Sequence, residues 1–423
     1  MTENKGYFHH FIERHRASRQ VIVQPRMGFS TTLKMRRGLR AVRDFEGLSI
    51  GTLTLDSKTR LRLFNEAAEA VRRRDPLNGY PIVTHGAVAT RELLAGVQGV
   101  DFPVQVRHGS PLPREVFEVS RAAGIDAIEG GPISYCLPYG RVPLAECVRA
   151  WGDCAGFWAA AGDEDGAINH LETFGGCMLG QLCPPALLVA ISVLEGLFFI
   201  SRGLRSVSVS HAQGTNSEQD IGGVLALRRL AGELFGATPW HVVLYTWMGL
   251  FPESERGARR IIEESARVAA VSGAARLIVK TTAEAHQIPT LADNLRAMRW
   301  SSDAAASAFG QPPSDDAVAA GEEIYWQAKR ITEAVLNLSP DVGQAIVKAF
   351  EKGLLDVPFC IHPDNRNEAR PYLDERSGFV GWSDIGRVPV AGERPGTRAR
   401  GFDSSALLRV LSYNQRKYDG GTL

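Results

Sequence analysis

Short stretches rich in β-branched residues alternate with helical patterns along most of this chain. We expect strands at residues 20–24, 50–54, 81–84, 103–106, 125–128, 206–209, 241–245 and 276–279. Helical patterns lie between them, among others at 57–74, 113–122, 186–202, 218–235 and 254–271. Strands that alternate with helices indicate a parallel sheet. Eight such units favour closure into a (β/α)8 TIM-type barrel over an open doubly wound sheet.

The rest of the chain extends this barrel. The longest gap between expected strands, 129–205, holds a helical pattern near 143–161 and has the length of a segment that covers an active site. After residue 312 the pattern changes to helices at 315–337 and 340–352, followed by an aperiodic stretch rich in Pro, Arg and Gly at 357–402. We therefore expect a barrel over 1–312 and a helical and irregular C-terminal extension, 313–423, packed on it.

Composition narrows the possible partners and compartments. The chain has 48 basic and 47 acidic residues, so its charge does not indicate a nucleic-acid partner. The longest apolar segment, 184–203, carries Glu195 and is too interrupted to cross a membrane, so it predicts a buried helix. The N-terminus lacks the apolar core of a signal peptide. We expect a soluble, cytoplasmic protein without a membrane partner.

The six cysteines form no CxxC pair and have no histidine at zinc-finger spacing. We expect them to be reduced and mostly buried, and we expect no metal site.

Three arginines follow expected strands and dominate the candidate site. Arg26 in VIVQPRMG, Arg60 in TLTLDSKTR and Arg107 in PVQVRHG all belong to βα loops, and the active sites of barrels collect in these loops. A guanidinium donates two parallel hydrogen bonds, which suits a carboxylate better than the point charge of a lysine does. Glu129, which ends a further strand, can pair with an amino group. The set predicts a pocket for an amino dicarboxylic acid.

Several motifs resemble those of one known family, the large (epsilon) subunit of glutamate mutase, also called methylaspartate mutase. They run in order over nearly the whole chain as QPRMG, LNGYP, RHGSP, EGGPISYCLPY, NSEQD, WMGLFP, KTTAEAHQIPT and LDVPF. The resemblance implies a (β/α)8 barrel and a radical carbon-skeleton rearrangement that interconverts L-glutamate and 3-methylaspartate with adenosylcobalamin.

The resemblance also implies roles for individual residues. The substrate would be bound by Arg26, Arg60, Arg107, His108, Glu129, Tyr135 and Tyr139. Glu129 would hold the amino group and act as the catalytic residue. Adenosylcobalamin would be bound by Gly28, Asn78, Pro138, Phe251, Lys280, Glu284 and Ile288. Taken without the motif, Lys280 and Glu284 would instead fit an i,i+4 pair on a helix surface.

A missing motif predicts a partner chain. Cobalamin proteins that bind the cofactor through a histidine carry DxHxxG, and no histidine here has Asp two residues before it. The chain would therefore need a separate small cobalamin-binding (sigma) subunit that holds most of the corrin. In the family the assembly is a heterotetramer of two large and two small chains.

Two alternatives remain open at this level. The chain could be a mutase for a related amino dicarboxylate, because the arginines do not define the length of the substrate. It could also be a non-catalytic barrel that binds glutamate or a cobalamin protein.

Overall fold

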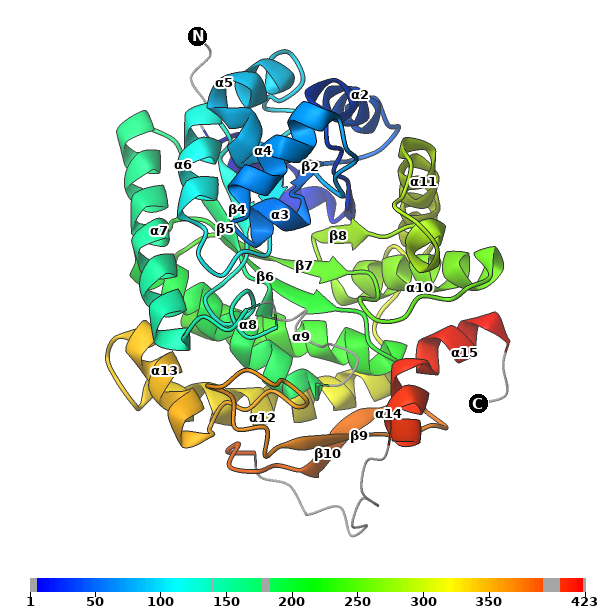
Figure 1. The fold of residues 1–423 in the computed structure, drawn as a ribbon. Coiled ribbons are helices and arrows are strands. Elements are labelled where there is room, and N and C mark those ends of the chain that lie inside the picture. Colours follow the sequence, from blue (N-terminus) through cyan, green and yellow to red (C-terminus); the bar gives the residue numbers. More distant parts are fainter. Residues whose placement is uncertain (1–5, 139, 176–182, 391–403, 421–423) are drawn as a thin grey trace.

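The computed structural model describes residues 6–138, 140–175, 183–390 and 404–420. An eight-stranded parallel sheet lies at its centre (Figure 1). The strands are β1 (Ile22–Pro25), β2 (Gly51–Thr54), β3 (Val104–Arg107), β4 (Ala127–Glu129), β5 (His170–Glu172), β6 (Val207–Ala212), β7 (Trp240–Tyr245) and β8 (Arg276–Val279). Strands β2 to β8 pair in sequence order, and β8 pairs with β1. A single bridge from Val23 to Ser49 then nearly closes the ring, so the predicted TIM-type barrel is confirmed.

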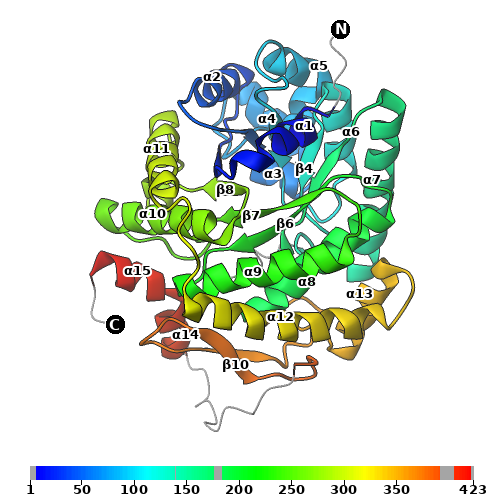
Figure 2. The same ribbon diagram turned by 180° about the vertical axis from the view of Figure 1, so that it is seen from behind.

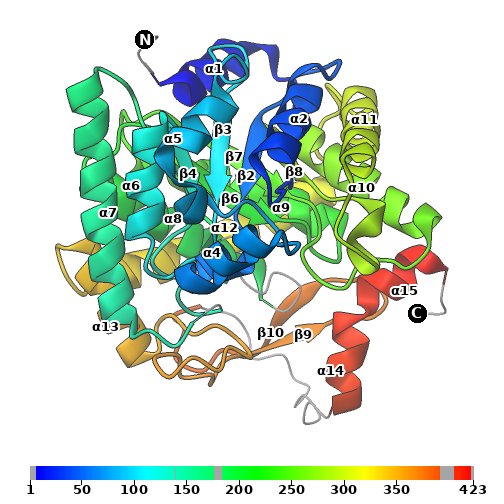
Figure 3. The ribbon, with the colours of Figure 1, turned by 45° about the horizontal axis from the view of Figure 1, so that its top comes forward.

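Helices surround these strands (Figure 3). In the barrel region they are α1 (Tyr7–His15), α2 (Thr32–Arg43), α3 (Ser57–Arg60), α4 (Phe64–Arg73), α5 (Ile82–Leu94), α6 (Arg114–Ala123), α7 (Leu144–Asp165), α8 (Pro185–Ser201), α9 (Ser217–Leu234), α10 (Glu255–Ser272) and α11 (Leu291–Ser307). Short 3-10 helices are described at η1 (Arg16–Ser18) and η3 (Thr282–Ala285). The predicted helix 57–74 is in fact two helices, because Arg62 has a φ of 62° and interrupts it.

One predicted strand was wrong and one strand was missed. Residues 81–84 are not a strand, because Ile82 begins α5. Pro81, with a φ of −80°, occupies the N-cap position of this helix. Proline is tolerated there because the backbone N–H groups at the start of a helix have no partner within the helix, so the N–H that proline lacks is not missed. The missed strand is β5, which lies in the gap 129–205. It has three residues and only Leu171 is apolar, so it carries no β-branched pattern.

Helix α1 covers the amino-terminal ends of the strands, as the reverse view shows (Figure 2). Phe8 and Phe11 form a small buried cluster with Ile22 and Ile50, which lie at the beginnings of β1 and β2. The Phe8 backbone N–H also donates to Asp126 Oδ2 at 3.1 Å. The first helix is therefore part of the barrel core, and it leaves the carboxyl-terminal ends of the strands open for a site.

The described residues after 313 lie along one side of the barrel (Figure 1). They comprise α12 (Asp315–Leu336), α13 (Val342–Lys352), the hairpin of β9 (Arg370–Leu373) and β10 (Val380–Asp384), α14 (Ser404–Leu411) and α15 (Tyr413–Asp419). Helix α12 packs against α8 and α9, α13 packs against α7 and α8, and α15 packs against α10. The boundary at 312/313 stays a prediction.

The apolar segment around Glu195 is the buried helix that the sequence predicts. It forms α8, whose residues are buried on nearly all sides between the sheet and α12. None of the helices in the described ranges is both long and apolar enough to cross a bilayer. Five cysteines are free and buried, namely Cys136, Cys147, Cys154, Cys183 and Cys360. Cys177 lies outside the described residues.

Candidate functional site

The three predicted arginines lie at the same end of the barrel. Arg107 is the last residue of β3 and its side chain is 4% exposed. Arg26 directly follows β1, and Arg60 ends the short helix α3 that follows β2. All three are therefore at the carboxyl-terminal ends of neighbouring strands, where barrels carry their active sites.

Asp56 fixes the helix that carries Arg60. Its Oδ1 accepts hydrogen bonds from the backbone N–H groups of Lys58 and Thr59 at 2.9 and 3.0 Å, and this caps the first turn of α3. The Arg60 side chain then lies over Gly109, where a Cβ atom would be 2.8 Å from Arg60 Cδ. Gly109 also has a φ of 72°, so glycine suits this turn in two ways. Arg60 thus lies beside the loop of Arg107.

A buried ion pair joins Arg107 to Glu129 at the end of β4. Arg107 Nε donates to Glu129 Oε2 at 2.5 Å, and the Tyr135 hydroxyl donates to Glu129 Oε1. Burial by itself would lower the pKa of Arg107, but the Glu129 carboxylate and the nearby tyrosines outweigh it and raise this pKa above its ordinary value. The structure therefore holds a charged pair in a site from which most water is excluded.

Two further residues, Tyr245 and Glu172, extend this pair across the barrel. The Tyr245 hydroxyl lies 2.7 Å from Glu129 Oε2 and also contacts Glu172 Oε1. Because a hydroxyl has one proton, it can donate to only one of the two carboxylates at a time. Burial would raise the pKa of Glu172, but its ion pair with Arg276 lowers it. A chain of ion pairs and hydrogen bonds thus runs from Arg107 across the barrel to Arg276, with the Tyr245 hydroxyl between the two carboxylates.

Sequence reasoning missed both residues. Tyr245 ends the predicted strand 241–245, so its place at the carboxyl end of a strand was the signal that could have found it. Glu172 gave no such signal, because its strand was not recognised.

Two buried donors in the site have no partner among the described residues, namely Arg107 Nη1 and His108 Nε2. His108 Nδ1 accepts from the Ser110 backbone N–H at 3.0 Å, so the proton of the neutral ring is on Nε2. Burial lowers the pKa of His108 to about 3, which keeps the ring neutral. An unpaired buried donor costs about 1–3 kcal/mol. A carboxylate within reach of either atom would satisfy that donor.

Lys280 and Glu284 lie next to this site and not on an open helix surface. Lys280 Nζ is 3.3 Å from Glu284 Oε2, and the side chains are only 7% and 16% exposed. The ammonium also lies 5.2 Å above the ring of Phe251. Burial lowers the pKa of Lys280, and the charges of two site arginines, Arg26 and Arg107, lower it further against the opposing effect of Glu284. The interpretation as an exposed i,i+4 pair is therefore wrong.

The remaining predicted residues differ in burial and in the contacts that they make. A Cβ atom on Gly28 would lie 2.2 Å from the Thr54 carbonyl oxygen, so this glycine is required by the packing of β2. Asn78 Oδ1 accepts from the Ser57 backbone N–H at 2.9 Å and so holds the start of α3. Pro138 is partly buried and Ile288 is exposed. Tyr139 lies outside the described residues.

Comparison with known proteins identifies the family. The sequence model of the methylaspartate mutase E chain (MutE) matches residues 3–403. The glutamate mutase epsilon subunit of Escherichia coli O157:H7 is 35% identical over 351 residues, which are 80% of this chain and 72% of that protein. The epsilon subunit of Desulfitobacterium hafniense is 31% identical over 88% of this chain and 78% of its own length. A putative fructose-1,6-biphosphate aldolase from Coccidioides immitis matches 82% of this chain and 99% of its own with a TM-score of 0.35 and 13% identity, too weak a likeness for any argument. This chain belongs to the methylaspartate mutase E chain family.

Proposed function

We propose that this chain is the substrate-binding subunit of an adenosylcobalamin-dependent mutase that interconverts L-glutamate and 3-methylaspartate. The observation that carries the proposal is the buried pair of Arg107 and Glu129 with unpaired donors beside it. A dicarboxylic amino acid supplies the two missing kinds of partner. One carboxylate accepts from Arg107 Nη1 and His108 Nε2, and the ammonium donates to Glu129.

The second carboxylate of the substrate needs its own cation. Arg26 and Arg60 flank the site from the ends of β1 and α3, and both are partly buried. Their planar forks can clamp a carboxylate from two sides, which fixes the orientation of the carbon chain. Fixed orientation matters in a radical reaction, because a radical removes hydrogen from any C–H group within reach.

The residues at the end of β8 fit the adenosyl group of the cofactor. Glu284 can accept hydrogen bonds from ribose hydroxyl groups, and Lys280 can donate to ring nitrogen or ribose oxygen atoms. Phe251 lies under the Lys280 ammonium and offers an apolar face. When it is bound, adenosylcobalamin supplies the radical that removes and returns one hydrogen atom. The chain itself binds the substrate, keeps water out and holds the ammonium at Glu129.

Exposed apolar side chains support a separate cobalamin-binding partner. Four of them follow β1, α3, β7 and β8 at the carboxyl-terminal end of the barrel, namely Leu33, Leu61, Leu250 and Ile288. Contiguous exposed apolar patches mark surfaces that another molecule covers, and we propose that these four side chains form such a rim. We propose that a small cobalamin-binding subunit lies on this rim, in a heterotetramer of two large and two small chains.

NMR of isotope-labelled L-glutamate tests the proposal. The chain is incubated with adenosylcobalamin and a small cobalamin-binding subunit from a relative, and the methyl signal of 3-methylaspartate is expected to appear. Without the small subunit no methyl signal should form. Binding of glutamate without any methyl product, in an assay where a related epsilon subunit is active, would contradict the proposed reaction and leave a binding function. Conversion of a different amino dicarboxylate alone would overturn the choice of substrate.

A further inference from the structure

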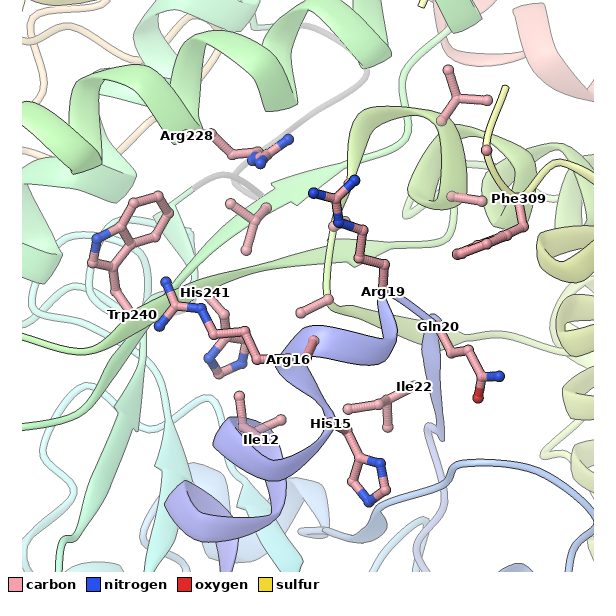
Figure 4. Close-up of a pocket in the computed structure, with 18 of the residues that line it drawn as sticks. Ile12, His15, Arg16, Arg19, Gln20, Ile22, Arg228, Trp240, His241 and Phe309 are labelled. Atoms are coloured by element: carbon pink, nitrogen blue, oxygen red, sulfur yellow. The ribbon is translucent and has the colours of Figure 1, made fainter. Parts of the chain in front are cut away.

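A large pocket lies at the end of the barrel opposite the candidate site (Figure 4). Its volume is about 880 Å³. Its walls come from α1, η1, α9, the beginnings of β1 and β7, the end of α10 with the turn that leads to β8, and the residues that follow α11. Trp240 and His241 are the first two residues of β7, which places the pocket at the amino-terminal ends of the strands. Cavities of about 300–1,000 Å³ are the usual size for small-molecule sites.

The pocket is positively charged. Arg16, Arg19 and Arg228 line it, and none of its described lining residues is Asp or Glu. Figure 4 shows the guanidinium groups of Arg19 and Arg228 turned toward the same space, while Arg16 points toward Trp240. Burial lowers the pKa of Arg228, and the charge of Arg19 lowers it further. Two cations are thus held close enough to repel each other.

Few carboxylates outside the pocket compensate this charge. Arg16 pairs with Glu13 at 3.4 Å, an exposed i,i+3 contact that is worth little. Arg228 donates to the backbone carbonyl of Ser272 at 3.0 Å and lies over Gly273, where a Cβ would be 2.7 Å from its Nη1. The Arg19 side chain makes no hydrogen bond or ion pair with any other described residue. An anion in the pocket would relieve the repulsion.

The rest of the lining is apolar and partly aromatic. The Trp240 ring lies on one side of the space and Phe309, which is 54% exposed, on the other (Figure 4). Ile12, Ile22 and Val242 complete the wall. An inorganic anion would leave these surfaces in contact with water, whereas a ligand with a flat ring can cover them.

We propose that this pocket binds a nucleoside di- or triphosphate. The phosphates lie among Arg16, Arg19 and Arg228, because planar guanidinium groups bind phosphate oxygens in pairs. The base contacts Phe309, since aromatic side chains stack on any nucleobase. The site is separate from the adenosyl site at the other end of the barrel and does not depend on the proposed mutase reaction.

Calorimetry with ATP in EDTA tests the proposal on the full chain. We expect saturable binding of one ATP, with at least tenfold weaker binding for Arg19→Gln and Arg228→Gln. Arg330→Gln is the matched control, because it removes one exposed positive charge on α12 outside the pocket. Its affinity for ATP should stay within twofold of the wild-type value. Phe309→Ala should weaken ATP binding about fivefold and leave the affinity for tripolyphosphate unchanged.

Three results would overturn the proposal. They are equal ATP affinities of wild type and Arg228→Gln, tripolyphosphate binding as tight as ATP binding, and competition between ATP and adenosylcobalamin. The first result would show that Arg228 does not bind the phosphates, and the second that Phe309 does not bind the base. The third would show that ATP binds at the other end of the barrel. Circular dichroism shows whether each variant is folded before its affinity is compared.

Discussion

At the scale of single residues, Arg107 performs two tasks with one side chain. Its Nε is bound to Glu129 at 2.5 Å, and its Nη1 remains without a partner among the described residues. A lysine has one ammonium group and no fork, so it cannot hold Glu129 and a substrate carboxylate in the same geometry. We expect Arg107→Lys to lower kcat/KM about a hundredfold, or about 3 kcal/mol.

Arg114→Lys is the matched control for this prediction, because Arg114 forms an exposed i,i+4 pair with Glu118. Its kinetics should equal those of the wild type. Steady-state turnover of glutamate with saturating partner and cofactor measures both variants. If Arg107→Lys also keeps normal kinetics, the fork is not needed and the proposed binding geometry is wrong.

The hydroxyl of Tyr245 positions Glu129 from the opposite side. Tyr245→Phe removes the donor that Glu129 and Glu172 share, while the ring keeps its contacts with Phe174 and Arg107. We expect kcat to fall about tenfold and KM to change less. The acid limb of the pH profile should also move to higher pH, because the hydrogen bond from Tyr245 helps to lower the pKa of Glu172 and its loss lets Glu172 be protonated more easily.

A buried hydroxyl outside the network of Glu129 and Glu172 serves as the control for Tyr245. Tyr80 bonds to Thr90 at 3.0 Å, so Tyr80→Phe should cost about 1 kcal/mol of stability without any change in the pH profile. Equal pH profiles of Tyr245→Phe and the wild type would reduce Tyr245 to a packing residue.

The site could be predicted only in part for a physical reason. Arg26, Arg107 and Glu129 directly follow strands or end them, and parallel strands in a barrel bring their carboxyl ends together. The contact of Tyr245 with Glu172 joins residues far apart in sequence and depends on how the interior of the barrel is filled. No local pattern contains that information.

At the scale of elements, the contact between α9 and α12 depends on two glycines. A Cβ atom on Gly222 of α9 would lie 2.7 Å from the backbone nitrogen of Gly321 and 2.8 Å from the carbonyl oxygen of Ala317, both in α12. Backbone cannot yield as a flexible side chain can, so the helices must move apart. We expect Gly222→Ala to destabilise the protein by about 1–3 kcal/mol.

Gly156 of α7 is the matched control, because nothing lies within 4 Å of the position that a Cβ atom would take there. Gly156→Ala should raise stability by about 0.5–1 kcal/mol through helix propensity alone. Urea unfolding followed by circular dichroism measures both changes. Opposite signs are expected, and stabilisation by both substitutions would show that α9 and α12 are not in tight contact.

The number of strands agrees with the prediction because two errors cancel. The run at 81–84 is mostly apolar, but it begins with Pro81 and leads into the first turn of α5. Strand β5 is short, and two of its three residues, His170 and Glu172, are polar and buried, with Glu172 ion-paired to Arg276. Patterns of β-branched residues find strands packed between apolar layers. They miss a strand whose side chains form a polar network inside a barrel.

At the scale of the whole molecule, stability should depend on buried groups that titrate near neutral pH. Burial raises the pKa of Asp126 and Glu195 to about 7 and that of Asp220 to about 8. These acids bind protons more tightly in the folded state than in the unfolded state. Their contribution to the free energy of unfolding is therefore fully present below the pKa of the unfolded state and is lost as the pH rises through the pKa of the folded state. Burial lowers the pKa of His170 and His241, whose contribution is lost as pH falls below about 6.5.

From pH 6.5 to 8 the histidines are largely neutral in both the folded and the unfolded state, so the three acids predict a decline in stability over this range. Each acid with a raised pKa contributes a slope of up to about 1.4 kcal/mol per pH unit to the free energy of unfolding while it titrates.

Asp220→Asn removes one such group and keeps an oxygen that can accept from the Gly214 backbone N–H, now 2.8 Å away. We therefore expect a shallower decline in Asp220→Asn, measured by urea unfolding at several pH values. Asp303→Asn, an exposed carboxylate on α11, should leave the slope unchanged. Parallel curves for Asp220→Asn and the wild type would mean that Asp220 is already ionised in the folded protein at neutral pH.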